Sequence, residues 1–252
     1  MRNFVTFRLN GRTRNVRDVS PTMTLLNYLR DLESLTGSKE GCAEGDCGAC
    51  TAVIGECVDG EIYYRAINTC IQFIAMLEGK SIFTIEYLNG SIDGLHPVQK
   101  ALVDEHGSQC GFCTPGFVMS LYAAYINGDH LDADTAPDQL AGNLCRCTGY
   151  GPIAAAAEKV GQLEAADWEV KDLEADRHWI RDHNRLETLN INFGGERFFS
   201  PGSLDDLAAC YAQNPDAVLV AGATDVGLWV TKAQKKLRSV IHLGRVEELR
   251  QI

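Results

Sequence analysis

The feature that most constrains this chain is a short stretch crowded with cysteine and glycine. Residues 41–51 read GCAEGDCGACT, so three thiols fall within nine residues and are interspersed with glycines and acids. Glycine adopts positive φ at little steric cost, so such a loop can curl tightly and turn several backbone N–H groups toward the sulfur atoms. The stretch therefore predicts a compact binding loop in place of a helix or strand.

The spacing of these cysteines indicates a particular ligand. Cys42, Cys47 and Cys50 are separated by four and two residues, and Cys70 follows after nineteen more. A C-x4-C-x2-C run with a distant fourth cysteine is the pattern of plant-type [2Fe–2S] proteins. Amides that point at the sulfurs would stabilise the negative charge of such a cluster. We predict that these four cysteines hold one [2Fe–2S] cluster.

Zinc and disulfide bonds are the competing explanations for this set. Structural zinc sites usually pair two C-x2-C knuckles, which this loop lacks. Disulfides are rare in the cytosol, where we expect the chain to reside. Cys57 and Cys210 lie outside any ligand spacing, and we expect both to be inert residues.

Four more cysteines form a second set. Residues 109–116 read QCGFCTPG and residues 143–150 read NLCRCTGY, which contain a C-x2-C and a C-x-C pair. Thr-Pro follows one pair and Gly-Pro the other, so we expect both pairs at the N-terminal ends of helices. Free N–H groups and the positive end of the helix dipole favour thiolates there. The combination is a strong signal for a metal or cluster site shared between two helix starts.

The composition limits the classes of partner. The formal net charge is −11, and a surface so acidic repels nucleic-acid phosphates and anionic lipid. The sequence contains no run of about 18 apolar residues that could span a membrane. Residues 1–20 lack the continuous apolar stretch of a signal peptide. We therefore predict a cytoplasmic protein that binds neither nucleic acid nor membrane.

Residues 1–88 are typical of a compact unit of strands and short helices. Asn-Gly and Asp-Gly turns mark two hairpins, and leucines at helical spacing predict an amphipathic helix. We expect strands at 4–9, 13–16, 52–54, 62–65 and 81–87, and helices at 21–35 and 68–77.

The next two stretches differ from the first unit and from each other. Residues 89–165 show no convincing strand, and their helical patterns predict a small bundle. Residues 166–194 are predicted to be a linker. Between 166 and 190 they carry seven acids and four bases with few clustered apolar residues, which is typical of a solvated tether. The predicted helices of the bundle are 96–106, 114–127, 135–142 and 152–165.

Residues 195–252 predict the beginning of an α/β unit. Ser203 can cap a helix that carries Leu204, Leu207 and Tyr211. A short buried strand at 217–220 then runs into the turn AGATDVG, and a further strand is expected at 239–242. A strand followed by a glycine turn can present N–H groups to an anion, although the same pattern is often mere topology.

Together, GCAEGDCGACT, QCGFCTPG and NLCRCTGY resemble the molybdenum hydroxylase family of xanthine dehydrogenases and aldehyde oxidases. The close match covers about residues 1–165. The resemblance implies an α+β multidomain fold. Its parts are a β-grasp plant-type ferredoxin domain, a four-helix [2Fe–2S] domain, and the N-terminal portion of an α/β FAD-binding domain. It also implies that the second cysteine set holds a second [2Fe–2S] cluster through Cys110, Cys113, Cys145 and Cys147.

The resemblance extends to two further contacts. Gln109 and Cys147 match positions that approach a molybdopterin carried by a large subunit. The segment LVAGATDV matches the turn that wraps the diphosphate of FAD, but the chain ends early in that domain, so we expect an incomplete FAD site. The predicted FAD contacts are Leu219, Val220, Ala221, Gly222, Ala223, Thr224, Asp225 and Val226.

By this resemblance the chain is expected to be an electron-transfer subunit, similar to the small subunit of bacterial two-subunit enzymes of the family. Electrons from molybdopterin on a large partner subunit would pass through two clusters to FAD and then NAD. Hypoxanthine or xanthine is the expected substrate, and we expect no catalytic acid, base or nucleophile on this chain. The expected assembly is a heterotetramer of two small and two large subunits, with the remainder of the FAD domain as a further partner.

Three alternatives stay open at this point. The partner could hydroxylate aldehydes or other N-heterocycles, which would be decided by a pocket outside this chain. The chain could instead be a stand-alone carrier of ferredoxin type, although the second cysteine set argues against that. A zinc-stabilised interaction protein is the third alternative.

Overall fold

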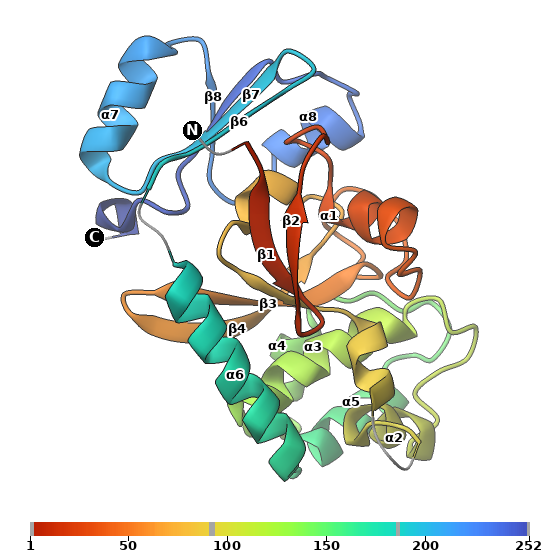
Figure 1. The fold of residues 1–252 in the computed structure, drawn as a ribbon. Coiled ribbons are helices and arrows are strands. Elements are labelled where there is room, and N and C mark those ends of the chain that lie inside the picture. The colour runs from red at the N-terminus through yellow and green to blue at the C-terminus, as the bar shows by residue number, and fades with distance from the viewer. Residues whose placement is uncertain (1–2, 91–93, 185–186, 251–252) are drawn as a thin grey trace.

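A computed structural model describes residues 3–90, 94–184 and 187–250, and its elements form two sheets and a helical layer (Figure 1). The first sheet has the strand order β2-β1-β5-β3-β4. It is antiparallel except where β1 pairs parallel with β5. Its strands are β1 (Val5–Leu9), β2 (Arg12–Val16), β3 (Thr51–Val58), β4 (Glu61–Asn68) and β5 (Ser81–Phe83), the last shorter than the predicted 81–87 and followed by a 3₁₀ turn at Ile85–Gly90.

Two tight turns set the register of this sheet. Asn10 and Gly11 have φ of 48° and 78°, and Asp59 and Gly60 have φ of 50° and 83°. Positive φ at both central residues is the requirement of a type I′ turn, whose twist matches that of the flanking strands. Both predicted hairpins are therefore confirmed.

The helices of the first unit are shorter than predicted. The helix predicted at 21–35 is α-helical only in α1 (Leu25–Asn27) and continues as a π-helical turn at Tyr28–Leu32. The helix predicted at 68–77 is reduced to one 3₁₀ turn at Ile74–Leu77. Apolar spacing correctly marked these segments as buried, but it does not report which backbone hydrogen bonds they form. Their apolar side chains pack on the sheet with Phe7, Leu9, Ile54, Phe73 and Ile82.

The second unit is helical, and its centre is α3. Every residue of α3 from Gly116 to Ile126 is buried, against β3, β4 and the neighbouring helices. A helix that is apolar all round belongs in a core. No helix in the described parts of the chain is long and apolar enough to cross a bilayer. The predicted bundle is confirmed as α2 (Pro97–Asp104), α3 (Thr114–Asn127), α4 (Ala136–Leu140) and α5 (Gly151–Val160).

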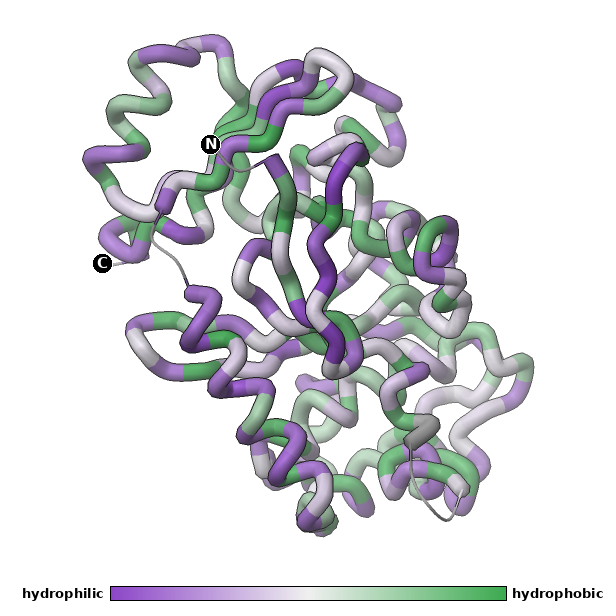
Figure 2. The backbone as a smooth tube through the Cα atoms, in the orientation of Figure 1, coloured by the Kyte–Doolittle hydropathy of each residue, from purple (hydrophilic) through white to green (hydrophobic). Residues whose placement is uncertain are grey.

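The predicted tether at 166–190 is wrong for most of its length, because Asp167–His183 form the helix α6. The buried side chains of α6 are spaced by four, three and four residues, so they share one face. Two of them are acids, and the helix is hydrophilic along most of its length (Figure 2). The sequence therefore lacks the apolar stripe by which a packed helix is recognised. These buried residues are Glu169, Leu173, Asp176 and Ile180.

Asp176 fastens α6 to the first sheet. Its carboxylate accepts hydrogen bonds from Arg8 Nη1 at 2.9 Å and from Ser81 Oγ at 2.6 Å. Tyr64 OH donates a third bond at 3.0 Å. The burial of Asp176 raises its pKa, while these donors act in the opposite direction. The acid is thus a fully satisfied buried group, which is the condition under which burial is tolerated.

Glu169 fastens the same helix to the helical unit. Its Oε1 lies 2.8 Å from His96 Nε2, and Tyr125 OH donates to its Oε2 at 2.8 Å. Both Glu169 and His96 are fully buried. Through its two acids, α6 bridges the first sheet and the helical unit.

The last unit is built on a sheet of order β6-β7-β9-β8. β6 and β7 form a hairpin around Gly194 and Gly195, a turn that the sequence analysis missed, and β6 lies inside the predicted linker 166–194. Ser203 Oγ accepts a hydrogen bond from Asp206 N at 3.2 Å and caps α7, as predicted. The elements are β6 (Leu189–Phe193), β7 (Glu196–Ser200), α7 (Leu204–Gln213), β8 (Val218–Val220), α8 (Val226–Thr231) and β9 (Ser239–His242), followed by a 3₁₀ turn at Glu247–Arg250.

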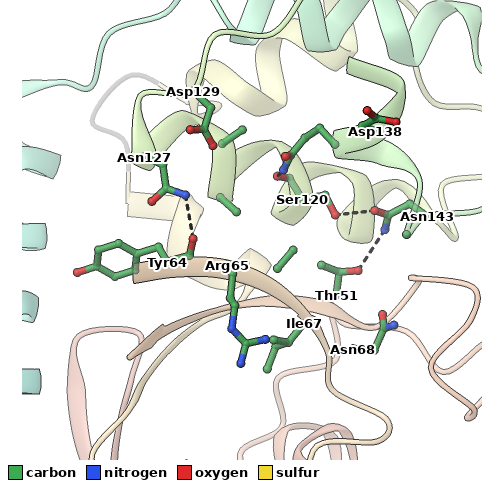
Figure 3. A pocket seen from close by; sticks show the side chains of 15 residues that line it. Thr51, Tyr64, Arg65, Ile67, Asn68, Ser120, Asn127, Asp129, Asp138 and Asn143 are labelled. Atoms are coloured by element: carbon green, nitrogen blue, oxygen red, sulfur yellow. Dashed lines mark hydrogen bonds between the residues drawn. The ribbon is translucent and has the colours of Figure 1, made fainter. Parts of the chain in front are cut away.

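The cysteine-rich loop docks on the helical unit through the buried Asn143, whose hydrogen bonds with Ser120 and Thr51 are drawn in Figure 3. Asn143 Nδ2 donates to Gly48 O at 3.0 Å and lies 3.1 Å from Thr51 Oγ1. Ser120 Oγ donates to Asn143 Oδ1 at 2.5 Å. Gly48 has φ of 69°, and a Cβ atom on it would lie 2.2 Å from Gly142 O. Glycine at this position therefore allows the two units to meet backbone to backbone.

Replacing Asp176 by alanine is expected to lower the free energy of unfolding by about 3 kcal/mol, because three donors lose their buried acceptor. Asp182 lies exposed on the same helix and provides the matched control. Asp182→Ala should change the free energy of unfolding by less than about 0.5 kcal/mol. Urea denaturation followed by circular dichroism measures both variants. Equal losses would contradict the role assigned to Asp176.

Gly48→Ala is expected to destabilise the protein by about 3 kcal/mol, since it combines an unfavourable left-handed conformation with a steric clash. Gly142→Ala is the control, because a Cβ atom there meets nothing within 4 Å. Thermal unfolding of the two variants compares them directly. A Gly48→Ala protein as stable as Gly142→Ala would show that the loop does not need this close approach.

Candidate iron–sulfur and flavin sites

The first site lies where the loop at 41–50 meets the segment that follows β4. The first site consists of Cys42, Cys47, Cys50 and Cys70. Their thiols influence one another in two pairs: Cys47 acts on the pKa of Cys42, and Cys70 on the pKa of Cys50. Cys50 and Cys70 are each only 2% exposed, so one pair is shielded from water. The fold thus brings together all four cysteines of the first predicted set.

Backbone amides of the loop favour the thiolate form at this site. Burial raises the pKa of Cys42, but amide hydrogen bonds outweigh it and the pKa is lowered. The hydrogen bond with Cys70 lowers the pKa of Cys50 to about 6. Thiolate is the form of cysteine that binds metal. The amides that donate to Cys42 Sγ, each at 3.4 Å, belong to Glu44, Asp46 and Cys47.

Gly45 shows why this loop needs glycine. Its N–H donates to Cys70 Sγ at 3.3 Å, and its φ is 78°. A Cβ atom at this position would lie 2.6 Å from the Ile71 side chain. The predicted tight curl with amides directed at sulfur is therefore confirmed.

The second site comprises Cys110, Cys113, Cys145 and Cys147, which also come together. Cys145 acts on the pKa of Cys113, and Cys110 on the pKa of Cys147. Cys113 is the N-cap of α3, and the C-x-C pair lies just before α5, as expected from the sequence. Unlike the first site, this one is open to solvent, because Cys110 and Cys147 are exposed.

The two partners of one second-site pair ionise differently. Burial, reinforced by the hydrogen bond with Cys145, raises the pKa of Cys113 to about 12. Burial also opposes ionisation of Cys145, but the Thr148 hydroxyl 3.2 Å from its sulfur helps to lower the pKa of Cys145. Groups of the helix-start loop thus favour ionisation of Cys145 over that of Cys113.

The number and kind of donors at each site indicate which metal group the site suits. A [2Fe–2S] cluster takes four cysteines, two on each iron, whereas structural zinc gathers four donors around one ion. Each site gathers four cysteines, which is the donor set that a [2Fe–2S] cluster takes.

One hydrogen bond joins the loops of the two sites. Leu144 N–H donates to Cys47 O at 3.0 Å, and Leu144 is the residue before Cys145. A ligand candidate of the first site is thereby linked to one of the second site through a single backbone bond. Sequence reasoning missed both Leu144 and the adjacent Asn143, because nothing in the cysteine spacing reports contacts between the two sets.

The surface around the second site is apolar. Phe112, Leu144 and Tyr150 are 47%, 49% and 42% exposed. Gln109, predicted to approach a pterin, is also exposed and adjoins Cys110. Exposed apolar side chains grouped around a functional site are typical of a partner interface.

The predicted flavin turn follows β8 directly. The strand ends at Val220 and α8 begins at Val226, so Ala221–Asp225 form the connection. Ala223 is buried with φ of 60°, while Gly222 and Thr224 are exposed. A Cβ atom on Gly222 would meet nothing within 4 Å, so the backbone there faces open space.

A cavity of about 380 Å³ lies between this turn and the segment that follows Cys70. Of the predicted FAD contacts, Ala221, Gly222 and Thr224 line it, and the other five do not. Ile71 and Gln72 line the opposite side. The Gln72 Nε2 atom is buried without a hydrogen-bond partner among the described residues. An unsatisfied buried donor together with accessible backbone fits a cavity made for a polar ligand.

Comparison with known protein families gives three matches that cover most of the chain. Residues 7–71 match the model of a 2Fe-2S iron-sulfur cluster binding domain, and residues 84–158 match that of a [2Fe-2S] binding domain. Residues 191–252 match the model of an FAD binding domain in molybdopterin dehydrogenase. The three domains follow one another in the predicted order.

Individual relatives of the chain agree with these family matches. A xanthine dehydrogenase of Blastobotrys adeninivorans is 48% identical over 62% of this chain, and aldehyde oxidase 3 of Mus musculus is 31% identical over 96%. The chain spans 11% and 21% of the lengths of these two relatives.

A solved structure of quinoline 2-oxidoreductase from Pseudomonas putida 86 superposes with a TM-score of 0.52 at 33% identity. The match covers 64% of this chain and 98% of the other. With three matching domains and such relatives, the chain belongs to the molybdenum hydroxylase family of xanthine dehydrogenases and aldehyde oxidases, as its iron–sulfur and FAD-binding region.

Proposed function

We propose that this chain carries electrons within a xanthine-dehydrogenase-like enzyme, from a molybdopterin on a partner subunit to FAD and then to NAD. The observation that carries the proposal is the contact between the two sites. Leu144 N–H binds Cys47 O at 3.0 Å, so the two thiol sets are joined by a short path of covalent bonds and one hydrogen bond. Such a short path suits electron transfer between two clusters better than it suits two independent structural sites.

When bound, two [2Fe–2S] clusters supply one-electron carriers, and FAD supplies a carrier that exchanges either one or two electrons. The residues of this chain hold and shield them. The two cysteine sets are the proposed ligands, and amides of the 41–50 loop stabilise thiolate at Cys42. Burial of Cys50 and Cys70 keeps water from the inner pair of the first site.

The exposure of the two sites supports a direction of transfer. The second site is open and bordered by exposed Phe112, Leu144 and Tyr150, which suits docking of a molybdopterin-binding large subunit. Gln109 can both donate and accept hydrogen bonds at a pterin edge. The first site is buried on the side of the flavin turn. Electrons would therefore enter at the second site and leave at the first.

The flavin turn is proposed to bind FAD together with the remainder of the FAD domain. Gly222 gives a diphosphate close access to the backbone, and Thr224 offers a hydroxyl at the same cavity. Leu228 of α8 packs on Cys50, Cys70 and Ile71, which places the turn next to the first site. This packing favours an assembled electron-transfer chain over a free ferredoxin-type carrier.

Hypoxanthine or xanthine is the proposed substrate class, with the chemistry located on the partner subunit. The high identity to a xanthine dehydrogenase supports this choice. Hydroxylation of aldehydes or other N-heterocycles is the alternative, favoured by the similarity to aldehyde oxidase 3 and to quinoline 2-oxidoreductase. We also propose a cytoplasmic complex of two small and two large subunits.

Cluster content tests the ligand assignment. The chain purified with its partner should contain about four irons and four sulfides and give two [2Fe–2S] EPR signals on reduction. Cys147→Ala should lose one signal and about half of the iron, since the second site loses a ligand. Cys57→Ala is the matched control and should keep both signals. Zinc in place of iron, or full iron in Cys147→Ala, would refute the assignment.

Reduction by substrate tests the class of enzyme. Under anaerobic conditions xanthine or hypoxanthine should bleach the visible absorbance of the complex, because electrons reach both sites from the partner subunit. Addition of NAD⁺ should then restore the absorbance. Bleaching by an aldehyde or by quinoline but not by xanthine would assign the protein to the alternative class.

A further inference from the structure

The side chain of Lys232 extends from the FAD-binding region to the loop of the first site. It follows α8 directly, and its Nζ donates a hydrogen bond to Cys42 O. The same ammonium lies 3.5 Å from the Glu44 carboxylate. Lys232 and Cys42 are far apart in sequence, so this contact exists only when the FAD-binding region is docked on the loop.

The contact places one positive charge in an acidic loop. The stretch from residue 40 to 46 carries Glu40, Glu44 and Asp46 and no basic residue. Among the ion pairs of the described residues, the acids of this stretch take part only in the one between Glu44 and Lys232. The stretch from 40 to 46 is therefore net negative by itself, and Lys232 is the cation that pairs with one of its acids.

A cation at this position acts on the charge of the site. Reduction of a [2Fe–2S] cluster adds one electron and hence one negative charge, which a nearby ammonium stabilises. Hydrogen bonds and charges around the ligands are among the factors that set cluster potentials. The side chains of Lys232 and Glu44 are 47% and 43% exposed, so solvent screening limits the effect.

We infer that Lys232 is a positioning residue that raises the reduction potential of the first site and makes that potential depend on docking of the FAD-binding region. This inference rests on the proposed function, in which the first site holds a cluster. The inference has a consequence for the direction of electron transfer. The first site draws electrons from the second site most strongly when the flavin turn is in place to pass them on.

EPR-monitored redox titration of the purified complex tests the inference with an internal reference. In Lys232→Gln the first-site potential should fall, with about a threefold change in the ratio of reduced to oxidised cluster at fixed potential. At 59 mV per decade for one electron this equals about 28 mV. The second-site potential should stay unchanged, and the difference should shrink at high salt.

Three further variants separate charge from structure. Lys232→Arg should restore the potential, because it keeps the cation. Glu44→Gln should raise the potential, because it removes a negative charge, whereas a purely structural role would shift it in the same direction as Lys232→Gln. Lys171→Gln removes an exposed lysine of α6, which lies outside both the loop and the FAD-binding region, and its shift should be much smaller.

The outcomes that overturn the inference differ from those that overturn the proposed function. An unchanged first-site potential in Lys232→Gln, or an equal shift at both sites, contradicts a role for Lys232 while both EPR signals persist. Absence of the signals in the unmodified complex contradicts the proposed function itself.

Discussion

The two cysteine loops approach each other so closely that no side-chain atom fits between their backbones. A Cβ atom on Gly48 would lie 2.2 Å from Gly142 O, and one on Gly116 would lie 2.1 Å from Gly48 O. Glycine at these positions lets Leu144 N–H reach Cys47 O. The buried amide of Asn143 also donates to the carbonyl of Gly48, which accepts hydrogen bonds from Thr51 as well. The spacing between the two proposed cluster sites depends on this contact.

The helix α6 holds the same two units together from another side. Asp176 accepts hydrogen bonds from three donors on strands of the first sheet, and Glu169 contacts His96 and Tyr125 of the helical unit. Buried acids with full sets of partners specify one arrangement, because any shift leaves a charge without its donors. Buried hydrogen bonds through α6 thus join the two units that carry the two thiol sets.

The FAD-binding region is attached by a mixture of apolar and polar contacts. Leu228 packs on the inner cysteines of the first site, and Lys232 binds the loop at Cys42 and Glu44. The flavin turn is consequently held beside the buried first site, while the second site stays open with its apolar border. This asymmetry is the physical basis for the proposed direction of electron flow.

Much of the local structure could be predicted because it rests on local rules. The hairpins at Asn10-Gly11 and Asp59-Gly60 require positive φ that their residues supply, and α3 is apolar throughout. The helix α6 was missed because two of its four buried residues are acids, so the usual apolar period is absent. The hairpin at Gly194-Gly195 was missed although its turn signal is present, because the preceding charged stretch was interpreted as a continuous linker.

The sequence by itself determined which cysteines form the two sets and which turn follows β8, since ligand spacing and glycine placement are properties of short segments. Only the tertiary structure decided how the sets face each other, that α6 ties their units together and that Lys232 reaches Cys42. Those relations join residues far apart in the chain through packing and buried hydrogen bonds. No local pattern records which distant partner a buried polar group will meet.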